Sequence, residues 1–563
     1  MKKISFALIA ACVVLLSSCS NKLTGLSSDY FTVTPQVLEA VNGEVPVTMH
    51  GTYPAKFFPK KAILTVTPVL KWNGGQVAGD SYIFQGEKVE GNYQMIPYKT
   101  GGNFTMKANY AYQPAMARSE LYLESKVKQG KKEKVLPAVK IADGVLATAQ
   151  LYTSTVASTT PAYAEDAFQR VIEQVKEANI KFLIQQTNLR MSELNSESIN
   201  ELKQTLQDIK ANEEGLVLDN IEVSAYASPD GDFDLNDRLA EQRQKNAEKY
   251  MNEQLKKAKM KDAFVDTEYT AEDWEGFQEL VAASNIPDKD LILRVLSMYK
   301  EPEAREREIK NISTVYGELA EQILPELRRA RLSLHYQVIG RDDEQILDAF
   351  KSEPAVLSVE ELLYAATLVD TDAGKTAIYK KCVSLYPQDY RAYNNLGQIA
   401  FAQGDYASAK GYLEKALSLN PNAAETNTNL GMIALMEGKV AQAEAYLAKG
   451  TDAKENEAAL GNLYIAQGQY ERAVAAFGDT KSNAAALAQI MAKNYTQAKT
   501  TLAAVENPDA YTSYLKAVLG ARTNNAAMVA ENLVQAVKMD KSLAEKAKND
   551  VEFTKFAATL AGL

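Results

Sequence analysis

The spacing of hydrophobic and polar residues changes twice along the chain and divides the sequence into three regions. Between residues 30 and 150, apolar and polar residues alternate, for example at Phe104, Met106, Ala108 and Tyr110. This period of two is typical of half-buried β-strands, and Gly- and Pro-containing segments separate the successive runs. We therefore predict an N-terminal antiparallel β-sandwich domain over residues 30–150.

A Ser/Thr-rich linker is predicted at residues 151–165, after which helical periodicity begins. Residues 166–345 then contain apolar runs typical of strands, which alternate with amphipathic stretches typical of helices. In chain order, the predicted strands and helices are 180–184, 196–210, 221–226, 236–250 and 327–337. This β-α-β-α-β order predicts a central α/β domain, with a long and more helical segment before its last strand.

The last third of the chain contains an internal repeat. Leu396-Gly397 recurs as Leu430-Gly431, and Pro387 recurs as Pro421, each after 34 residues. A period of 34 with paired helices resembles the tetratricopeptide (TPR) repeat. The resemblance implies an all-α solenoid of about five repeats over residues 346–542, followed by a capping helix at 543–563.

Stacked repeats of this kind have a concave groove lined by the first helix of each repeat. On the inferred helix phase, the residues that face this groove or its edge are Phe401, Leu435, Met436 and Ile465. Their apolar character favours a peptide or helix from a protein partner as the ligand. The same four residues could instead pack between neighbouring repeats, and the sequence does not decide between these alternatives.

A motif in the central region suggests a second binding site. The strand at 221–226 is followed by the turn Ala227-Ser228-Pro229-Asp230-Gly231 and by a helix that contains Asn236 and Arg243. This arrangement resembles the OmpA-like C-terminal domain, over roughly residues 160–260 and 325–340. The family binds peptidoglycan by holding the diaminopimelate of the stem peptide, through an aspartate in the turn and an arginine in the helix.

The resemblance places Arg243 on the family arginine and Asn236 on the asparagine that precedes it. The family aspartate falls on Ser228, and Asp230 lies two residues later. An arginine suits carboxylate binding because its planar guanidinium can form two parallel hydrogen bonds. Asp230, Asn236 and Arg243 are therefore candidate peptidoglycan contacts. Arg243 could alternatively be a structural anchor for the turn.

No residue pattern indicates a metal, a cofactor or an enzyme active site. The acidic residues around Asp230 and Asp232 partly match a calcium-binding loop, but Leu235 stands where that loop needs glycine and Arg238 would repel the ion. A helix N-terminus also favours acidic residues, because of its dipole. With only two histidines and no nucleophile–base pair, we predict a non-catalytic protein without cofactors.

The first residues predict a lipid anchor. Met1-Lys2-Lys3 precedes an apolar run, and the segment ends in Leu16-Ser17-Ser18-Cys19. This resembles the lipobox of bacterial lipoproteins, which implies a signal peptide at 1–18, diacylglycerol attachment to Cys19 and a tether at 19–29. Ser20 and Asn21 replace the acidic residue that retains lipoproteins in the inner membrane, so the outer membrane is expected. No acidic run indicates surface export, and we expect a periplasm-facing position.

Composition and charge restrict the kinds of partner and cross-link that this chain can have. The 563 residues include 62 Lys and Arg and 72 Asp and Glu, for a net charge of −10, or about −12 without the signal peptide. This charge argues against nucleic acid and against a polybasic membrane contact. Cys382 would be the single cysteine left unmodified, so an intramolecular disulfide is excluded.

The sequence therefore favours an outer-membrane lipoprotein that acts as a structural and interaction scaffold. Lipid would attach it to the membrane, the OmpA-like domain could contact peptidoglycan, and the repeats would bind an unknown protein partner. The alternative is an accessory factor for assembly or secretion of a surface appendage, in which the OmpA-like domain is only a scaffold.

Overall fold

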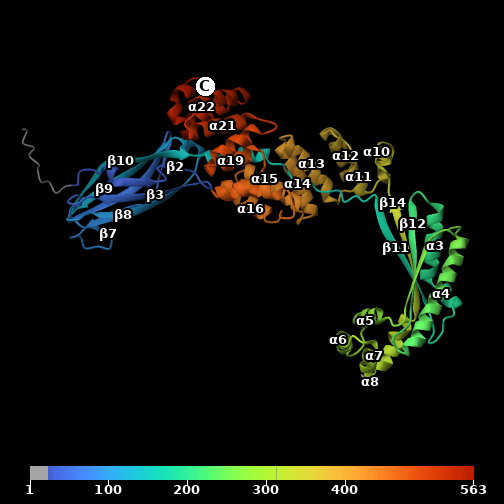
Figure 1. Ribbon diagram of the computed structural model, residues 1–563. Helices are drawn as coiled ribbons and strands as arrows, with labels where there is room; N and C mark the ends of the chain where they lie inside the picture. The colour runs from blue at the N-terminus through green and yellow to red at the C-terminus, as the bar shows by residue number, and fades with distance from the viewer. Residues whose placement is uncertain (1–22, 312) are drawn as a thin grey trace, which may run out of the picture. The chain divides into compact units, whose positions relative to one another are not determined.

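The computed structural model describes residues 23–311 and 313–563, which form two compact units (Figure 1). Unit 1 combines the chain up to Glu165 with Asp370–Leu563, and unit 2 is Asp166–Val369. The predicted signal peptide and Cys19 lie outside the described residues. None of the helices in the described ranges is long and apolar enough to cross a membrane.

Unit 1 begins with two β-sheets that share one hydrophobic core, which contains Met49, Leu64, Met106 and Leu121. The three-stranded sheet has the order β1 (Phe31–Thr34), β3 (Glu44–Tyr53), β8 (Gly102–Ala111). The seven-stranded sheet has the order β2 (Val37–Glu39), β10 (Lys132–Leu146), β9 (Ser119–Gln129), β4 (Ala62–Trp72), β6 (Tyr82–Gly86), β7 (Gln94–Ile96), with β5 (Gly75–Ala78) paired to β4. The N-terminal region is thus β-rich. Its pairs are antiparallel except β2 with β10 and β6 with β7, where the expected antiparallel pattern is interrupted.

The repeats form the C-terminal part of unit 1. After α12 (Asp372–Leu385), consecutive helices pack in pairs, and α23 (Leu543–Asn549) and α24 (Ala557–Ala561) follow the last pair. Gly397 packs directly against Leu413 of the next helix, so a β-carbon at residue 397 would lie 2.7 Å from Leu413 Cγ. The pairs are α13 (Tyr390–Ala402) with α14 (Tyr406–Leu419), α15 (Ala424–Met436) with α16 (Val440–Leu447), α17 (Asn456–Ala466) with α18 (Tyr470–Phe477), α19 (Asn483–Met491) with α20 (Tyr495–Ala503), and α21 (Ala510–Arg522) with α22 (Ala526–Met539).

Residues 148–165, which we call the strap, connect β10 to unit 2. The strap begins with short helical turns, η3 (Thr148–Leu151), α1 (Tyr152–Thr155) and η4 (Val156–Ser158), and continues as extended chain. Ala149, Leu151, Tyr152 and Val156 belong to the same hydrophobic core as the repeats. The segment that composition marks as a linker is therefore also a packed part of unit 1.

Unit 2 contains a four-stranded sheet in the order β11 (Val171–Lys181), β14 (Arg329–Ile339), β12 (Leu216–Tyr226), β13 (Val265–Thr270). Helices α3 (Glu197–Ala211) and α4 (Phe233–Lys257) share a core with these strands. Strand β12 includes the predicted strand 221–226, and β14 overlaps the predicted strand 327–337. The first strand differs from the predicted 180–184, since β11 starts at Val171 and ends at Lys181. Strand β13 is an addition to the predicted order.

The segment between β13 and β14 is helical, as its sequence suggested. It contains α5 (Trp274–Ala283), α6 (Lys289–Met298), α7 (Pro302–Asn311), α8 (Ser313–Gln322) and α9 (Leu324–Leu327). These helices form a small core of their own around Phe277, Ile292 and Leu319. Short α2 (Met191–Leu194) precedes α3, and α10 (Asp343–Ser352) and α11 (Val359–Ala365) complete the unit.

Candidate functional site

The strap lies along the first helices of the repeats, on the side of the array that we call the groove. Helix α1 of the strap packs against α15, α17 and α19. The strap runs opposite to the order of the repeats: Thr148 Oγ1 donates to Glu552 Oε1 (2.5 Å) after the last pair, whereas Ala164 reaches Asn395 in α13. The groove of this array is thus occupied by the chain's own residues.

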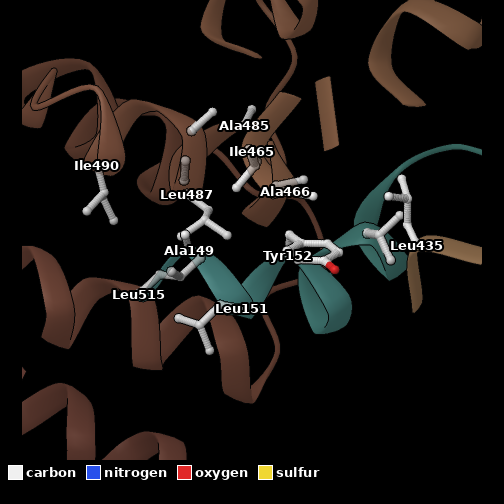
Figure 2. Close-up of a cluster of buried hydrophobic side chains, with 14 of the residues drawn as sticks. Ala149, Leu151, Tyr152, Leu435, Ile465, Ala466, Ala485, Leu487, Ile490 and Leu515 are labelled. Atoms are coloured by element: carbon white, nitrogen blue, oxygen red, sulfur yellow. The ribbon is translucent and has the colours of Figure 1, made fainter. Parts of the chain in front are cut away.

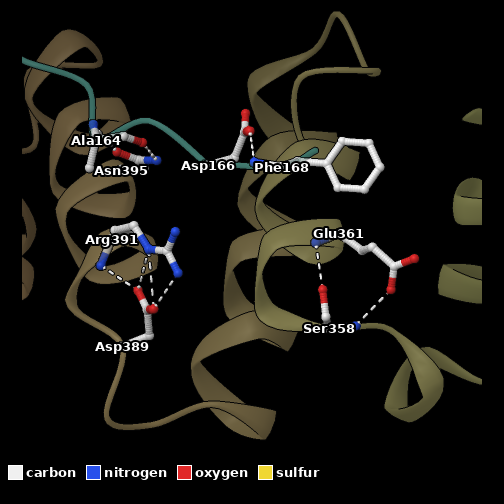
Figure 3. A network of polar contacts seen from close by, with 8 residues as sticks. All are labelled: Ala164, Asp166, Phe168, Ser358, Glu361, Asp389, Arg391 and Asn395. Carbon is white, nitrogen blue, oxygen red and sulfur yellow. Dashed lines mark hydrogen bonds and ion pairs between the residues drawn. The ribbon is translucent and has the colours of Figure 1, made fainter. Parts of the chain in front are cut away.

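Two asparagines bind the main chain of the extended part of the strap. Asn429 accepts a hydrogen bond from Ala162 N (2.6 Å) and donates one to Ala162 O (2.8 Å). Asn395 makes the same pair of bonds to Ala164 N and Ala164 O, both at 2.9 Å (Figure 3). Asn394 adds a bond to Ala162 O at 3.1 Å. Asn429 and Asn395 thus each bind both main-chain groups of one strap residue.

The four predicted groove residues lie in the repeat core or at its boundary. Phe401, Leu435 and Ile465 are buried, and Met436 is half-buried and packs against the same core. Figure 2 shows Leu435 and Ile465 in one cluster with Leu151 and Tyr152 of the strap. Leu435 and Ile465 therefore lie on the side of the repeats that faces the strap. Phe401 packs edge-on against Tyr406 of the following helix, with the ring centroids 5.3 Å apart.

The asparagines that bind the strap were not predicted from the sequence. Asn395 and Asn429 are 34 residues apart and directly precede the two Leu-Gly pairs that defined the repeat. They are fully buried, although asparagine is usually exposed. The signal that could have found them is this recurrence of a polar residue, at the repeat period, within otherwise apolar first helices.

A second candidate site is a small polar pocket in unit 2. The structure brings the predicted residues Asp230, Asn236 and Arg243 to the lining of one cavity of about 50 Å³, together with Ser228 and Arg328. The pocket lies where β12 ends and α4 begins. Asp232 caps α4 by accepting a hydrogen bond from Leu235 N (3.1 Å), which is the helix-terminus role considered for these acidic residues.

Arg243 is held by main-chain carbonyls. Its Nε donates to Gln186 O (3.1 Å) and its Nη1 to Tyr226 O (2.8 Å), while its guanidinium lies 5.0 Å from the ring centroid of Phe182. The side chain is buried, and no carboxylate of the described residues forms an ion pair with it. Burial and the nearby charge of Arg328 lower the pKa of Arg243 to about 10. These contacts hold the guanidinium between the end of β12 and the segment after β11, and they keep a cation at the pocket wall.

Asp230 already has a cationic partner. Arg328 Nη2 donates to Asp230 Oδ2 (3.0 Å), and Arg328 Nε donates to Ser228 Oγ (3.0 Å). Ser228 Oγ in turn donates to Asp230, and Asn236 Nδ2 donates to Ser228 O (3.2 Å). The Arg328 and Asp230 side chains are only 11% and 16% exposed. Hydrogen bonds thus link Arg328, Asp230 and Ser228 in one network, while Arg243, bound to its two carbonyls, lines the same pocket.

Comparison with known proteins identifies the repeats. Two tetratricopeptide-repeat family models match residues 378–411 and 400–463. No curated protein matches the chain.

Three solved structures are similar to parts of the chain. A tetratricopeptide repeat protein from Parabacteroides merdae is 16% identical over 35% of this chain and 85% of its own, with a TM-score of 0.27. PilW, a type IV pilus biogenesis factor, is 18% identical over 35% of this chain and 90% of its own (TM-score 0.25). PilF of Pseudomonas aeruginosa is 14% identical over 39% of this chain and 99% of its own (TM-score 0.26). Because the two family models match within it, the C-terminal region of this chain contains tetratricopeptide repeats.

Proposed function

We propose that this protein is a non-catalytic lipoprotein of the cell envelope that acts as a structural and interaction scaffold. The observation that carries the proposal is the tetratricopeptide array, because such arrays present extended surfaces for protein partners. In this proposal, a lipid on Cys19 attaches the chain to the outer membrane, on its periplasmic side, and unit 2 contacts peptidoglycan.

The anchor is supported by the basic start, the apolar run and the cysteine at the end of the signal segment. If the proposal holds, Cys19→Ser will abolish acylation and leave uncleaved precursor at the inner membrane, because no thiol remains to receive the diacylglycerol. Metabolic labelling with a fatty-acid probe measures this, with Cys382→Ser as the matched control that should keep its label. Label retained on Cys19→Ser would contradict the lipobox assignment.

The peptidoglycan contact is supported by the charges of the pocket in unit 2. A diaminopimelate end group carries both an ammonium and a carboxylate, and the pocket has Asp230 for the former and Arg243 and Arg328 for the latter. A cavity of about 50 Å³ is too small for this ligand as it stands. In our proposal the ligand separates the Arg328–Asp230 ion pair. The ligand's ammonium then pairs with Asp230, and its carboxylate pairs with Arg243 and Arg328.

Sedimentation of the full chain with purified sacculi tests this contact. Asp230→Asn removes the ammonium partner while keeping the side-chain shape, and we expect it to weaken binding roughly ten- to a hundredfold, from a loss of about 1.5–3 kcal/mol. Arg243→Ala should weaken binding similarly. Ser228→Asp should strengthen binding, because it restores a carboxylate at the position that the resemblance gives to the family aspartate. Arg238→Ala is the matched control, since Arg238 is exposed on the same helix and does not line the pocket.

The melting temperature of each variant separates lost binding from lost folding, because Arg243 also binds two carbonyls of its own chain. Equal sedimentation of wild type, Asp230→Asn, Arg243→Ala and Ser228→Asp would contradict the peptidoglycan contact.

One observation favours the alternative, an accessory factor for assembly or secretion of a surface appendage. The polar groups of the unit 2 pocket already satisfy one another through Arg328, Asp230 and Ser228, as they would in a domain that serves only as a scaffold. Failure of the sacculi experiment, with acylation intact, would select this alternative.

A further inference from the structure

We propose that the repeat groove is a binding site for an extended peptide with small residues at alternate positions, and that its resident ligand is the chain's own strap. The external protein partner would then bind the array outside this groove. This last consequence rests on the proposed function, whereas the identity of the groove's ligand does not.

The groove recognises a main chain. Ala162 and Ala164 are two positions apart, which is the spacing at which an extended chain presents its main-chain groups to the same side. Asn429 and Asn395 meet these two residues with one acceptor and one donor each. A side-chain amide used in this way imitates the edge of a neighbouring β-strand. Because the two asparagines recur at the repeat period, the site arises from the repeat itself.

Side-chain size adds selectivity to this main-chain recognition. Ala162 and Ala164 are fully buried, and Ala162 packs against Ala424 and Ala453 of the repeats. A larger residue at either position would have to displace the repeats. Tyr163, between them, is only half-buried, and its hydroxyl accepts a hydrogen bond from Tyr379 (3.4 Å). The ligand class is therefore an Ala-Xaa-Ala segment in extended conformation.

Further contacts continue the site toward the later repeats. Asn462 Nδ2 donates to Thr159 Oγ1 (2.8 Å), and Ala484 N, at the start of α19, donates to Ser158 Oγ (3.2 Å). Leu151 and Tyr152 then enter the hydrophobic core of the repeats (Figure 2). The strap is thus held by main-chain bonds at one end and by buried apolar side chains at the other.

The strap also has the advantage of being tethered. A ligand joined to its site by a short connection acts at an effective concentration of the order of millimolar. The strap follows β10 directly, since β10 ends at Leu146 and the strap begins at Thr148. A free peptide of equal intrinsic affinity at micromolar concentration would therefore occupy the groove in fewer than roughly one molecule in a hundred.

A binding experiment with the full chain tests the proposal. The probe is a fluorescent synthetic peptide of residues 147–167. The two proteins are wild type and a Tyr152→Asp, Ala162→Glu variant, whose strap cannot bind in the groove because both substitutions would bury a charge. We expect the variant to bind the peptide saturably and to recover part of its lost melting temperature, and wild type to bind at least a hundredfold more weakly. Equally tight binding to both proteins, or binding to neither, would overturn the proposal.

A second experiment covers the case in which that variant does not fold. A protease site inserted after Ala167, which is exposed, allows the strap to be cut from unit 2 in the folded full chain. The two fragments should elute together, and Asn395→Ala with Asn429→Ala should speed their dissociation at least tenfold. Asn532→Ala is the matched control, because within the described ranges the Asn532 amide donates to Met528 O of its own helix.

Dissociation of the asparagine double variant at the wild-type rate would overturn main-chain recognition by the groove. Neither experiment uses membranes, sacculi or an external partner. Their failure would therefore leave the proposed function standing, and failure of the sacculi and labelling experiments would leave the groove inference standing.

Discussion

Two glycines of the repeats differ in the space around them, and we expect their replacement by alanine to change stability in opposite directions. At Gly397 an added β-carbon would lie 2.7 Å from Leu413 Cγ, whereas at Gly411, in α14, it would meet no atom within 4 Å. Gly397→Ala should therefore destabilise unit 1 by about 1–3 kcal/mol through overpacking. Gly411→Ala should stabilise it by about 0.4–1 kcal/mol, because alanine restricts the unfolded chain.

Thermal unfolding of the full chain measures both effects, and Gly431→Ala provides a second test of the first, since a β-carbon there would lie 2.6 Å from Leu447 Cδ2. Shifts of the same sign for Gly397→Ala and Gly411→Ala would contradict the helix packing described for the repeats.

Residues of the unit 2 pocket could be predicted only where they are close in sequence. Asp230, Asn236 and Arg243 lie within one turn and the following helix, so their spacing alone places them near one another, and the structure puts all three on one pocket. Arg328 is about a hundred residues away and reaches the pocket because β14 pairs with β12, with Ala330 opposite Ala225. No local pattern reports such a pairing, so the ion pair that closes the pocket was missed.

At the scale of elements, hydrophobic periodicity predicts helices and strands that bury one regular face. It misses strands that are held mainly by pairing with a segment far away in the sequence. Helix α3 buries a regular apolar face and matches its predicted range closely. Helix α4 was predicted at 236–250, but it begins at Phe233 and ends at Lys257, and polar residues share its buried face. In β11 only Ala178 and Ile180 are buried, so apolar alternation appears only at its end. The strand nevertheless pairs with β14 over its whole length. Its first part is held by main-chain hydrogen bonds, which leave no hydrophobic pattern in the sequence.

The strap illustrates the same limit more strongly. Its Ser and Thr content is typical of a linker, and its apolar residues form runs too short to predict a helix or a strand. They are buried because the repeats supply the surface that receives them. Whether a hydrophobic residue in a linker-like segment is buried therefore depends on a surface formed by residues more than 200 positions later in the chain.

At the scale of the whole molecule, the order of the sequence does not match the order of the units. Unit 1 is discontinuous, since the β-rich region and the strap come before unit 2 and the repeats come after it. The sequence divides into consecutive regions because composition and periodicity are local properties. The grouping of the first region with the third follows from long-range contacts, such as those of Ala162 and Ala164 with the repeats.

Two compact units with separate cores should unfold as two separate transitions. Leu202 and Leu413 are both fully buried helix leucines, one in the core of unit 2 and the other in the core of unit 1. Replacement of either by alanine should cost its own unit roughly 2–5 kcal/mol, because buried methyl groups are lost and a cavity remains.

Differential scanning calorimetry of the full chain distinguishes the units. Leu202→Ala should lower only the transition of unit 2, by roughly 4–20 °C for a unit of this size. Leu413→Ala should lower only the other transition, by fewer degrees, because unit 1 is larger and its unfolding entropy is greater. Parallel shifts of both transitions in either variant would mean that the cores unfold cooperatively, and would contradict the division at Glu165 and Asp370.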